Sequence, residues 1–156
     1  MADAAAPEKD ETHLFEVDAT WSGDGMGCGR LRMPQGDISI EIGGSRKIGG
    51  CGVGANPEEL LLGAVAACFI NTWAIFLKKL NVAYAEPALR VSGTLGKDPA
   101  GGYKMLKMTV HARVPAPLIA QQKAQVDKTL QLAEKYCIIS KAVKTSVPLR
   151  VEVEEV

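Results

Sequence analysis

The chain has 156 residues, which is enough for one domain with a modest hydrophobic core. Its 18 lysines and arginines balance 18 aspartates and glutamates, so we do not expect a general binder of nucleic acid or of acidic membranes, which needs a basic excess. Four cysteines are too few for a disulfide scaffold, and the start MADAAAPEKDETH has neither the basic nor the apolar part of a signal peptide. We therefore expect a cytoplasmic protein whose cysteines are reduced.

The N-terminal third predicts a tail and three short strands. Residues 1–12 are small or charged without periodicity, so we expect them to be disordered and residues 13–156 to form a single domain. Alternating patterns predict strands over residues 13–20, 30–33 and 37–42.

Two glycine-rich segments, residues 21–29 and 43–55, follow the first and third of these strands. The first segment lacks the strand-to-helix transition and the Gly-Lys-Ser/Thr of a phosphate-binding loop, which favours a hairpin loop. The second leads directly into the most apolar part of the chain.

The stretch NPEELLLGAVAACFINTWAIFLKK, residues 56–79, dominates the chain. Its middle, residues 60–77, has no charged side chain. The start combines the N-cap residue Asn56 with Pro57 and two glutamates, and the end carries two lysines, all of which match the preferences of helix ends. The stretch therefore predicts one helix of about six to seven turns.

This uncharged run is about as long as the shortest apolar stretch that can span a membrane, on the order of 18 residues. Asn71 and Thr72 inside the run, and the small residues along it, favour instead a buried helix at the centre of a soluble protein. One sheet in a chain of this size cannot easily cover every side of such a helix. A dimer, in which a second copy supplies the missing cover, would solve this problem, and a membrane anchor is the alternative.

The second half predicts strands and one amphipathic helix. Residues 88–96 and 103–114 alternate like strands joined by a turn, and residues 149–153 alternate as a last strand. Residues 118–136 place apolar side chains on one stripe of a helix and charged ones on the other face. The order of three strands, a buried helix, two strands, an amphipathic helix and one strand predicts an α+β fold.

No pattern in the chain is typical of a metal site. The four cysteines are isolated, without a Cys-x-x-Cys pair, and both histidines, His13 and His111, lie in predicted strands without a second ligand nearby. We therefore expect neither a bound metal nor another cofactor.

Two cysteines lie in predicted helices, Cys68 inside the apolar one and Cys137 at the end of the amphipathic one. Both can be small buried hydrophobes, which is the usual fate of a free cysteine. Alternatively, Cys68 is a thiolate that attacks a peroxide O–O bond, and its sulfenic acid condenses with Cys137 to a disulfide. This second alternative requires a positive charge that lowers the pKa of the thiol.

The segment NPEELLLGAVAACF, together with the later cysteine in YCIIS at residues 136–140, resembles the OsmC/Ohr family of osmotically inducible and organic hydroperoxide resistance proteins. The similarity extends from about residue 13 to residue 153. It implies an OsmC-like α+β fold with antiparallel sheets, a long buried central helix, a second amphipathic helix and an intertwined homodimer. It also implies a thiol peroxidase that reduces organic hydroperoxides and is recycled by a dithiol such as a lipoylated protein.

Matched residue by residue, the resemblance makes Cys68 the peroxidatic cysteine, Cys137 the resolving cysteine and Glu58 the acidic partner of a catalytic arginine. Ten residues of helix span about 15 Å, so we expect Glu58 to serve a Cys68 site across a dimer interface.

The chain departs from the family in three ways. The catalytic arginine of the family has no exact match in the first glycine-rich segment, so Arg30 is the candidate, with Arg32 and Arg46 as alternatives. In the family the second cysteine motif often opens with Cys-Pro, whereas here Cys137 is followed by Ile138. Cys28 and Cys51 are additional, either as bystanders or as alternative resolving thiols.

These observations predict a cytoplasmic, homodimeric, cysteine-dependent hydroperoxide reductase, with apolar residues near Phe69 and Trp73 shaping its pocket. The alternative is an OsmC-like dimer that binds an apolar ligand or partner without catalysis. The alternative is favoured because no arginine matches the catalytic arginine of the family exactly. The enzyme is favoured because both cysteines are present. We expect neither a nucleic acid nor a membrane as a partner.

Overall fold

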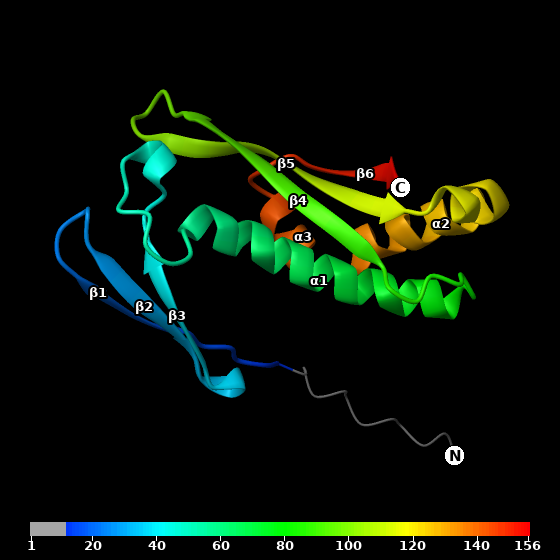
Figure 1. The fold of residues 1–156 in the computed structure, drawn as a ribbon, viewed down its shortest axis with the longest axis horizontal. Coiled ribbons are helices and arrows are strands. Elements are labelled where there is room, and N and C mark those ends of the chain that lie inside the picture. The colour runs from blue at the N-terminus through cyan, green and yellow to red at the C-terminus, as the bar shows by residue number, and fades with distance from the viewer. Residues whose placement is uncertain (1–11) are drawn as a thin grey trace, which may run out of the picture. The chain divides into compact units, whose positions relative to one another are not determined.

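The computed structural model describes residues 12–156, so the predicted disordered segment, residues 1–12, lies outside the described residues apart from Thr12. The chain divides into two compact units, with the division after Pro57. Figure 1 shows the elements of both units.

The first unit is a three-stranded antiparallel sheet in the order β1-β2-β3. Its elements are β1 (Asp18–Ser22), β2 (Cys28–Met33), β3 (Ile38–Gly43) and two single turns of 3-10 helix, η1 (Pro34–Gly36) and η2 (Arg46–Ile48). The three predicted strands are confirmed, but β1 begins later than residue 13. Asp18 pairs with Arg32 near the end of β2. Only Met33 remains in β2 before the chain turns at Pro34, so the residues before β1 have little of β2 left to pair with.

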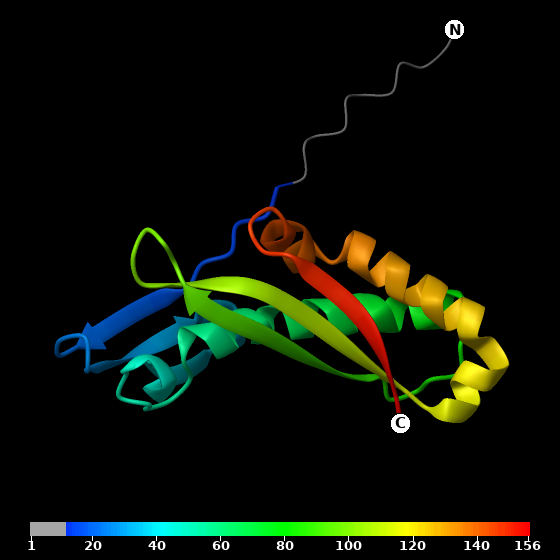
Figure 2. The ribbon, with the colours of Figure 1, turned by 90° about the horizontal axis from the view of Figure 1, so that it is seen from above.

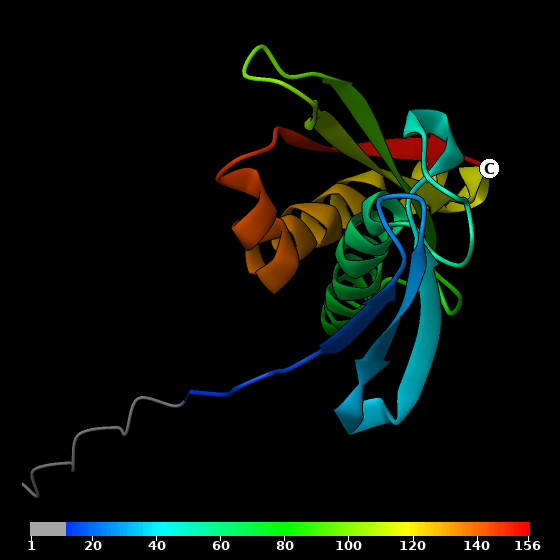
Figure 3. The ribbon, with the colours of Figure 1, turned by 90° about the vertical axis from the view of Figure 1, so that its left-hand side faces the viewer.

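The second unit places three helices on one face of a three-stranded sheet, as Figures 2 and 3 show. The helices and strands are α1 (Pro57–Lys79), β4 (Ala88–Lys97), β5 (Tyr103–Val114), α2 (Ala116–Tyr136), α3 (Ile138–Lys144) and β6 (Leu149–Glu155). The α+β fold class is confirmed, and α1 matches the predicted helix of residues 56–79 to within one residue.

The second sheet is mixed, whereas we expected antiparallel sheets only. Its order is β4-β5-β6, and β6 runs parallel to β5. The chain leaves β5, crosses the sheet through α2 and α3, and returns in the original direction. Such a helical crossover connects parallel neighbours, whereas antiparallel neighbours are joined by a hairpin.

The core of the second unit lies between α1, α2 and the sheet. A stripe of four side chains on α1, one per turn, is buried: Val65, Phe69, Trp73 and Leu77. It packs with the inward side chains of β5 and α2 in one cluster. The Trp73 indole N–H donates to the Thr129 hydroxyl of α2 at 2.9 Å, which satisfies the one polar group that the indole brings into the core.

The opposite side of α1 is exposed within one chain. Leu61 and Ile75 are 38% and 46% exposed, and Ala64 and Ala67 on the same side are exposed as well. Among the described residues, α1 is the one helix long and apolar enough to cross a bilayer by length and composition. The core helix of a soluble protein can be equally long and apolar. The buried stripe shows that one side of α1 packs in the core of the second unit.

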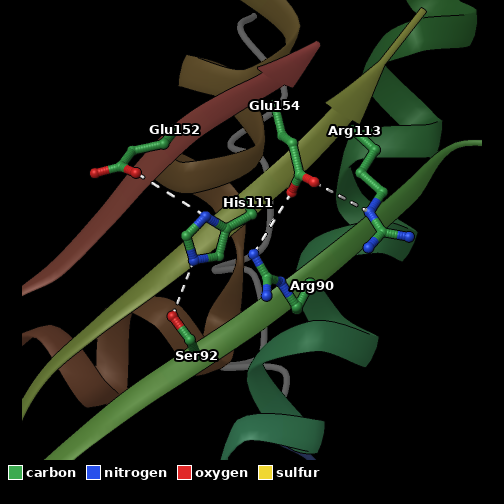
Figure 4. A network of polar contacts seen from close by, with 6 residues as sticks. All are labelled: Arg90, Ser92, His111, Arg113, Glu152 and Glu154. Atoms are coloured by element: carbon green, nitrogen blue, oxygen red, sulfur yellow. Dashed lines mark hydrogen bonds and ion pairs between the residues drawn. The ribbon is translucent and has the colours of Figure 1, made fainter. Parts of the chain in front are cut away.

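The outer face of the second sheet is polar (Figure 4). His111 Nε2 lies 2.9 Å from Ser92 Oγ and His111 Nδ1 lies 3.9 Å from Glu152. Arg90 and Arg113 flank Glu154 at 3.7 Å and 3.9 Å. His111 is thus a residue of a cross-strand network on a partly exposed surface, where each such pair contributes at most about 1 kcal/mol.

Candidate active site

The end of α2 brings Cys137 against the middle of α1, where Cys68 lies. Cys137 directly follows α2 and is fully buried, while Cys68 is partly buried on α1. The two side chains are hydrogen-bonded to each other. Of the residues that the sequence singled out, these are the two that the structure brings together.

Cys137 also begins α3, a helix that the sequence analysis did not predict. Its sulfur accepts the backbone N–H of Ser140 at 3.4 Å and so caps the helix. The usual N-cap residues are Ser, Thr, Asp and Asn, so a cysteine gives no signal of a helix start. This cap directs the first backbone N–H groups of α3 toward Cys68.

The pKa of the Cys68 thiol is lower than its ordinary value. Burial is the largest single influence and raises the pKa, but several hydrogen bonds to the sulfur together outweigh it. In order of size, these come from the Ile139 N–H, the Cys137 thiol, the Ile138 N–H and the Thr72 hydroxyl. The Thr72 contribution is the smallest of the four, and the single hydroxyl proton of Thr72 is donated to the Cys68 carbonyl at 2.8 Å.

The pKa of the Cys137 thiol is shifted in the opposite direction. Burial is the largest influence and raises the pKa, and hydrogen bonds from the Ser140 side chain and backbone lower it. The hydrogen bond and the charge of Cys68 raise the pKa as well, so that the net shift is upward. Because the two pKa values are shifted in opposite directions, there is a pH range in which one thiol is ionised while the other keeps its proton. Cys68 is the thiol that ionises first, and Cys137 donates to it.

A groove of about 610 Å³ opens beside Cys68. Its walls are mostly apolar or aromatic and come from α1, α2 and α3: Asn71, Thr72, Ile75, Phe76, Lys79, Leu132, Tyr136 and Ile138. Its volume lies in the range of pockets that hold small organic molecules. We expected apolar residues near Phe69 and Trp73 at the pocket; Phe69 and Trp73 themselves are fully buried in the core, and Ile75 and Phe76 line the groove.

Lysines stand around the aromatic side chains of this groove. Lys79 Nζ lies 5.4 Å from the ring centre of Phe76. Lys135 and Lys141 lie 5.3 Å and 5.9 Å from the ring centre of Tyr136. Lys79 lines the groove, and Lys135 and Lys141 lie over the ring of a groove residue. Sequence analysis missed this grouping because the three lysines belong to three separate helices.

Glu58 lies ten residues before Cys68 on the same unbroken helix, which is about 15 Å. It does not contact Cys68 of its own chain. One of its carboxylate oxygens, Oε2, is buried and has no hydrogen-bond partner within residues 12–156. A buried carboxylate oxygen without a donor costs free energy, so this position is suited to a cation that the single chain does not supply.

The candidate arginines belong to the first unit. Arg30 is in β2, in register with Glu41 of β3, and Arg32 lies 4.0 Å from Asp37. Arg46 donates its Nε–H to the Cys51 carbonyl at 3.3 Å. An arginine beside Cys68 stays a prediction. In the described part of the chain, no group of three or more His, Cys, Asp or Glu side chains is placed to hold a metal ion.

The family of this fold follows from comparison with known proteins. A family model described as OsmC-like protein matches residues 49–152, which is most of the chain. The chain belongs to the OsmC-like family. The resemblance of the cysteine segments to this family is thereby confirmed.

Relatives of this OsmC-like chain include proteins named for hydroperoxide resistance. It is 32% identical over 105 residues to the organic hydroperoxide resistance protein-like 1 of Staphylococcus epidermidis, covering 67% of this chain and 73% of that protein. It is 28% identical over 145 residues to YmaD of Bacillus subtilis, covering 90% of this chain and 93% of that protein.

Solved structures share its fold. The organic hydroperoxide resistance protein OsmC of Legionella pneumophila has a TM-score of 0.73 at 20% identity, covering 92% of this chain and 99% of that one. OhrB of B. subtilis has a TM-score of 0.69 at 22% identity, covering 91% and 100%.

Proposed function

We propose that this OsmC-like protein is a thiol peroxidase that reduces organic hydroperoxides, with Cys68 as the peroxidatic and Cys137 as the resolving cysteine. The observation that carries the proposal is the contact between the two thiols, at which backbone N–H groups of α3 hold the pKa of Cys68 below its ordinary value. A cysteine that is a bystander in a core needs no such donors. The hydroperoxide resistance names of the relatives support the same reaction class.

The chemistry has three steps. The Cys68 thiolate attacks the distal oxygen of the hydroperoxide, the O–O bond breaks, and the alkoxide takes a proton to leave as an alcohol. Cys68 is then a sulfenic acid, and Cys137 attacks its sulfur, so that a disulfide forms and water leaves. A dithiol reductant, such as a lipoylated protein, reduces the disulfide by thiol–disulfide exchange.

The groove beside Cys68 supports an organic substrate. Ile75, Phe76, Tyr136 and Ile138 offer apolar and aromatic surface to the group that carries the O–O bond. Hydrogen peroxide has no such group, so this surface would stabilise only an alkyl or aryl hydroperoxide.

A homodimer is part of the proposal. The exposed apolar side of α1 needs cover, and a second copy of the same helix is a self-complementary partner for it. The unpartnered Oε2 of Glu58 supports a role for that carboxylate next to a cation of the completed site, with Arg30 as the first candidate. A cytoplasmic location fits a reaction that needs a supply of reduced dithiol.

Oxidation by one equivalent of cumene hydroperoxide tests the proposal directly. We expect the protein to lose two hydrogens and to gain a Cys68–Cys137 link, read by mass spectrometry after trypsin. The Cys51→Ser variant is the protein to use, because Cys51 and Cys68 otherwise lie on one tryptic peptide, residues 48–78. Cumyl alcohol, which lacks the O–O bond, is the matched control and should leave both thiols free.

Unchanged free thiols after the hydroperoxide would contradict the enzyme. They would favour the alternative, an OsmC-like protein that binds an apolar ligand in the groove without catalysis.

The isoleucine that follows Cys137 leads to a pH prediction. Cys137 has φ −64° and ψ 113°, an extended conformation that proline accepts at the next residue, and the first position of a helix tolerates proline. Ile138→Pro should therefore keep α3 but remove one N–H group that lowers the pKa of Cys68. Because the thiolate is the reactive form, the rise of activity with pH should move to higher pH.

The pH dependence of iodoacetamide alkylation at Cys68 measures this shift without relying on peroxidase activity. Ile138→Ala is the matched control, since it removes the same side chain and keeps the N–H. An equal profile for the proline and alanine variants would contradict the role of this backbone donor.

A further inference from the structure

The first unit holds a second pair of cysteines, Cys28 and Cys51, that the proposed peroxidase reaction does not use. Cys28 is exposed at the start of β2, and Cys51 is partly buried in the glycine-rich loop after β3. They are 23 positions apart in sequence, but the loop folds back onto the end of β3: Gly52 N–H donates to Gly44 O at 2.9 Å and Gly43 N–H to Ala55 O at 3.1 Å.

Two independent contacts place the Cys51 sulfur next to Cys28. The Cys51 Sγ–H donates to the Gly27 carbonyl at 3.1 Å. That carbonyl belongs to the peptide bond leading into Cys28, so by standard peptide dimensions the Cys28 Cα lies within roughly 6 Å of the sulfur.

The second contact involves Gly43, which pairs with Cys28 across β2 and β3. Directly paired residues of antiparallel strands project side chains from the same face. A Cβ at Gly43 would lie 2.6 Å from the Cys51 sulfur, so this sulfur occupies the space that a side chain of residue 43 would fill. It therefore lies on the face from which the Cys28 side chain projects.

We propose that Cys28 and Cys51 form a second redox-active cysteine pair, which becomes a disulfide by exchange with a low-molecular-weight disulfide. The exposed Cys28 thiolate attacks one sulfur of the small disulfide, whose S–S bond breaks and releases one thiol. Cys51 then attacks the Cys28 sulfur of the mixed disulfide and releases the second thiol. The protein loses two protons and two electrons, and the small disulfide gains both and becomes two thiols.

The disulfide would fix the glycine-rich loop to β2. Arg46 belongs to this loop and is held by the Cys51 carbonyl through its Nε–H, and its side chain lies over Gly52, where a Cβ would come within 2.4 Å of Nε. The oxidation state of the pair would therefore constrain the segment that carries this arginine. The inference rests on the first unit alone and does not depend on the proposed peroxidase.

The test uses the Cys68→Ser/Cys137→Ser protein, in which no peroxidase reaction is possible and each remaining cysteine lies on its own tryptic peptide, residues 10–30 and 48–78. The protein is equilibrated with mixtures of oxidised and reduced glutathione, quenched with acid and mapped. We expect a loss of two hydrogens and a link between the two peptides. The linked fraction should rise with the proportion of oxidised glutathione in one transition with a single midpoint. Wild-type protein cleaved with trypsin and a glutamate-specific protease, which separates Cys51 from Cys68, gives the same measurement without the substitutions.

Two further variants sharpen the result. Cys51→Ser should stop at a stable glutathione adduct on Cys28. Gly43→Ala, whose new Cβ would lie 2.6 Å from both the Cys51 sulfur and the Val53 carbonyl oxygen and so displaces the loop that carries Cys51, should require more oxidised glutathione for the same extent of linkage. Gly25→Ala is its matched control, because a Cβ there meets nothing within 4 Å. A glutathione adduct on Cys28 without any internal link, while Cys51 is present, would overturn the proposal.

Discussion

Replacing Cys68 by serine is expected to reduce the consumption of cumene hydroperoxide by a dithiol to the rate of the dithiol alone. The hydroxyl of serine does not ionise near neutral pH, so the N–H groups of Ile138 and Ile139 would have no thiolate to stabilise. An oxygen also cannot accept the oxygen of the peroxide and form the equivalent of a sulfenic acid. The loss should therefore be complete, and the measurement is the rate of hydroperoxide disappearance.

Two companion variants separate the roles of the cysteines. Cys137→Ser keeps the attacking thiolate but has no resolving thiol, so it should consume one equivalent of hydroperoxide and leave a sulfenic acid that dimedone traps. Cys28→Ser should retain the turnover of the wild-type protein. A Cys68→Ser protein with wild-type turnover would refute the proposed mechanism.

Introducing a carboxylate on the exposed side of α1 should dissociate the proposed dimer. Ala64 is exposed in the single chain and lies on the same side of the helix as Leu61. In a dimer built on this side, Ala64→Glu would bury one unpaired charge in each copy. Such a charge costs about 3 kcal/mol or more, which is over a hundredfold in the dissociation constant. Light scattering across a range of protein concentrations measures the change.

Ala124→Glu is the matched control, since Ala124 is also exposed in a helix and both changes exchange one good helix former for another. It should leave the oligomeric state unchanged. If the Ala64→Glu protein keeps the wild-type mass, α1 is not the dimer interface. If it becomes monomeric and keeps full activity, the partner's Glu58 takes no part in the reaction.

The sequence predicted the elements that carry strong local signals. Both ends of α1 follow from Asn56, Pro57 and the terminal lysines, whose preferences agree with each other. The phase of this helix could not be predicted, because apolar residues occupy every side of it. For this reason the expectation that apolar residues near Phe69 and Trp73 shape the pocket could not say which ones: the structure buries Phe69 and Trp73 in the core and has Ile75 and Phe76 in the groove.

The features that were missed arise from backbone atoms and chain direction. The N–H groups that stabilise Cys68 belong to isoleucines, and any residue except proline would supply them. The sulfur cap that begins α3 has no conventional signature. Alternation in residues 149–153 indicates which face of a strand is buried but not whether its neighbour runs in the same direction, so the parallel pairing of β6 could not be predicted.

The place of β6 at one edge of its sheet has a consequence for how this protein meets its own copies. An edge strand offers unpaired backbone groups to any other extended chain, and charged side chains are a common means of preventing such addition. β6 carries Arg150, Glu152, Glu154 and Glu155 within seven residues. These charged side chains discourage the addition of another strand at this edge.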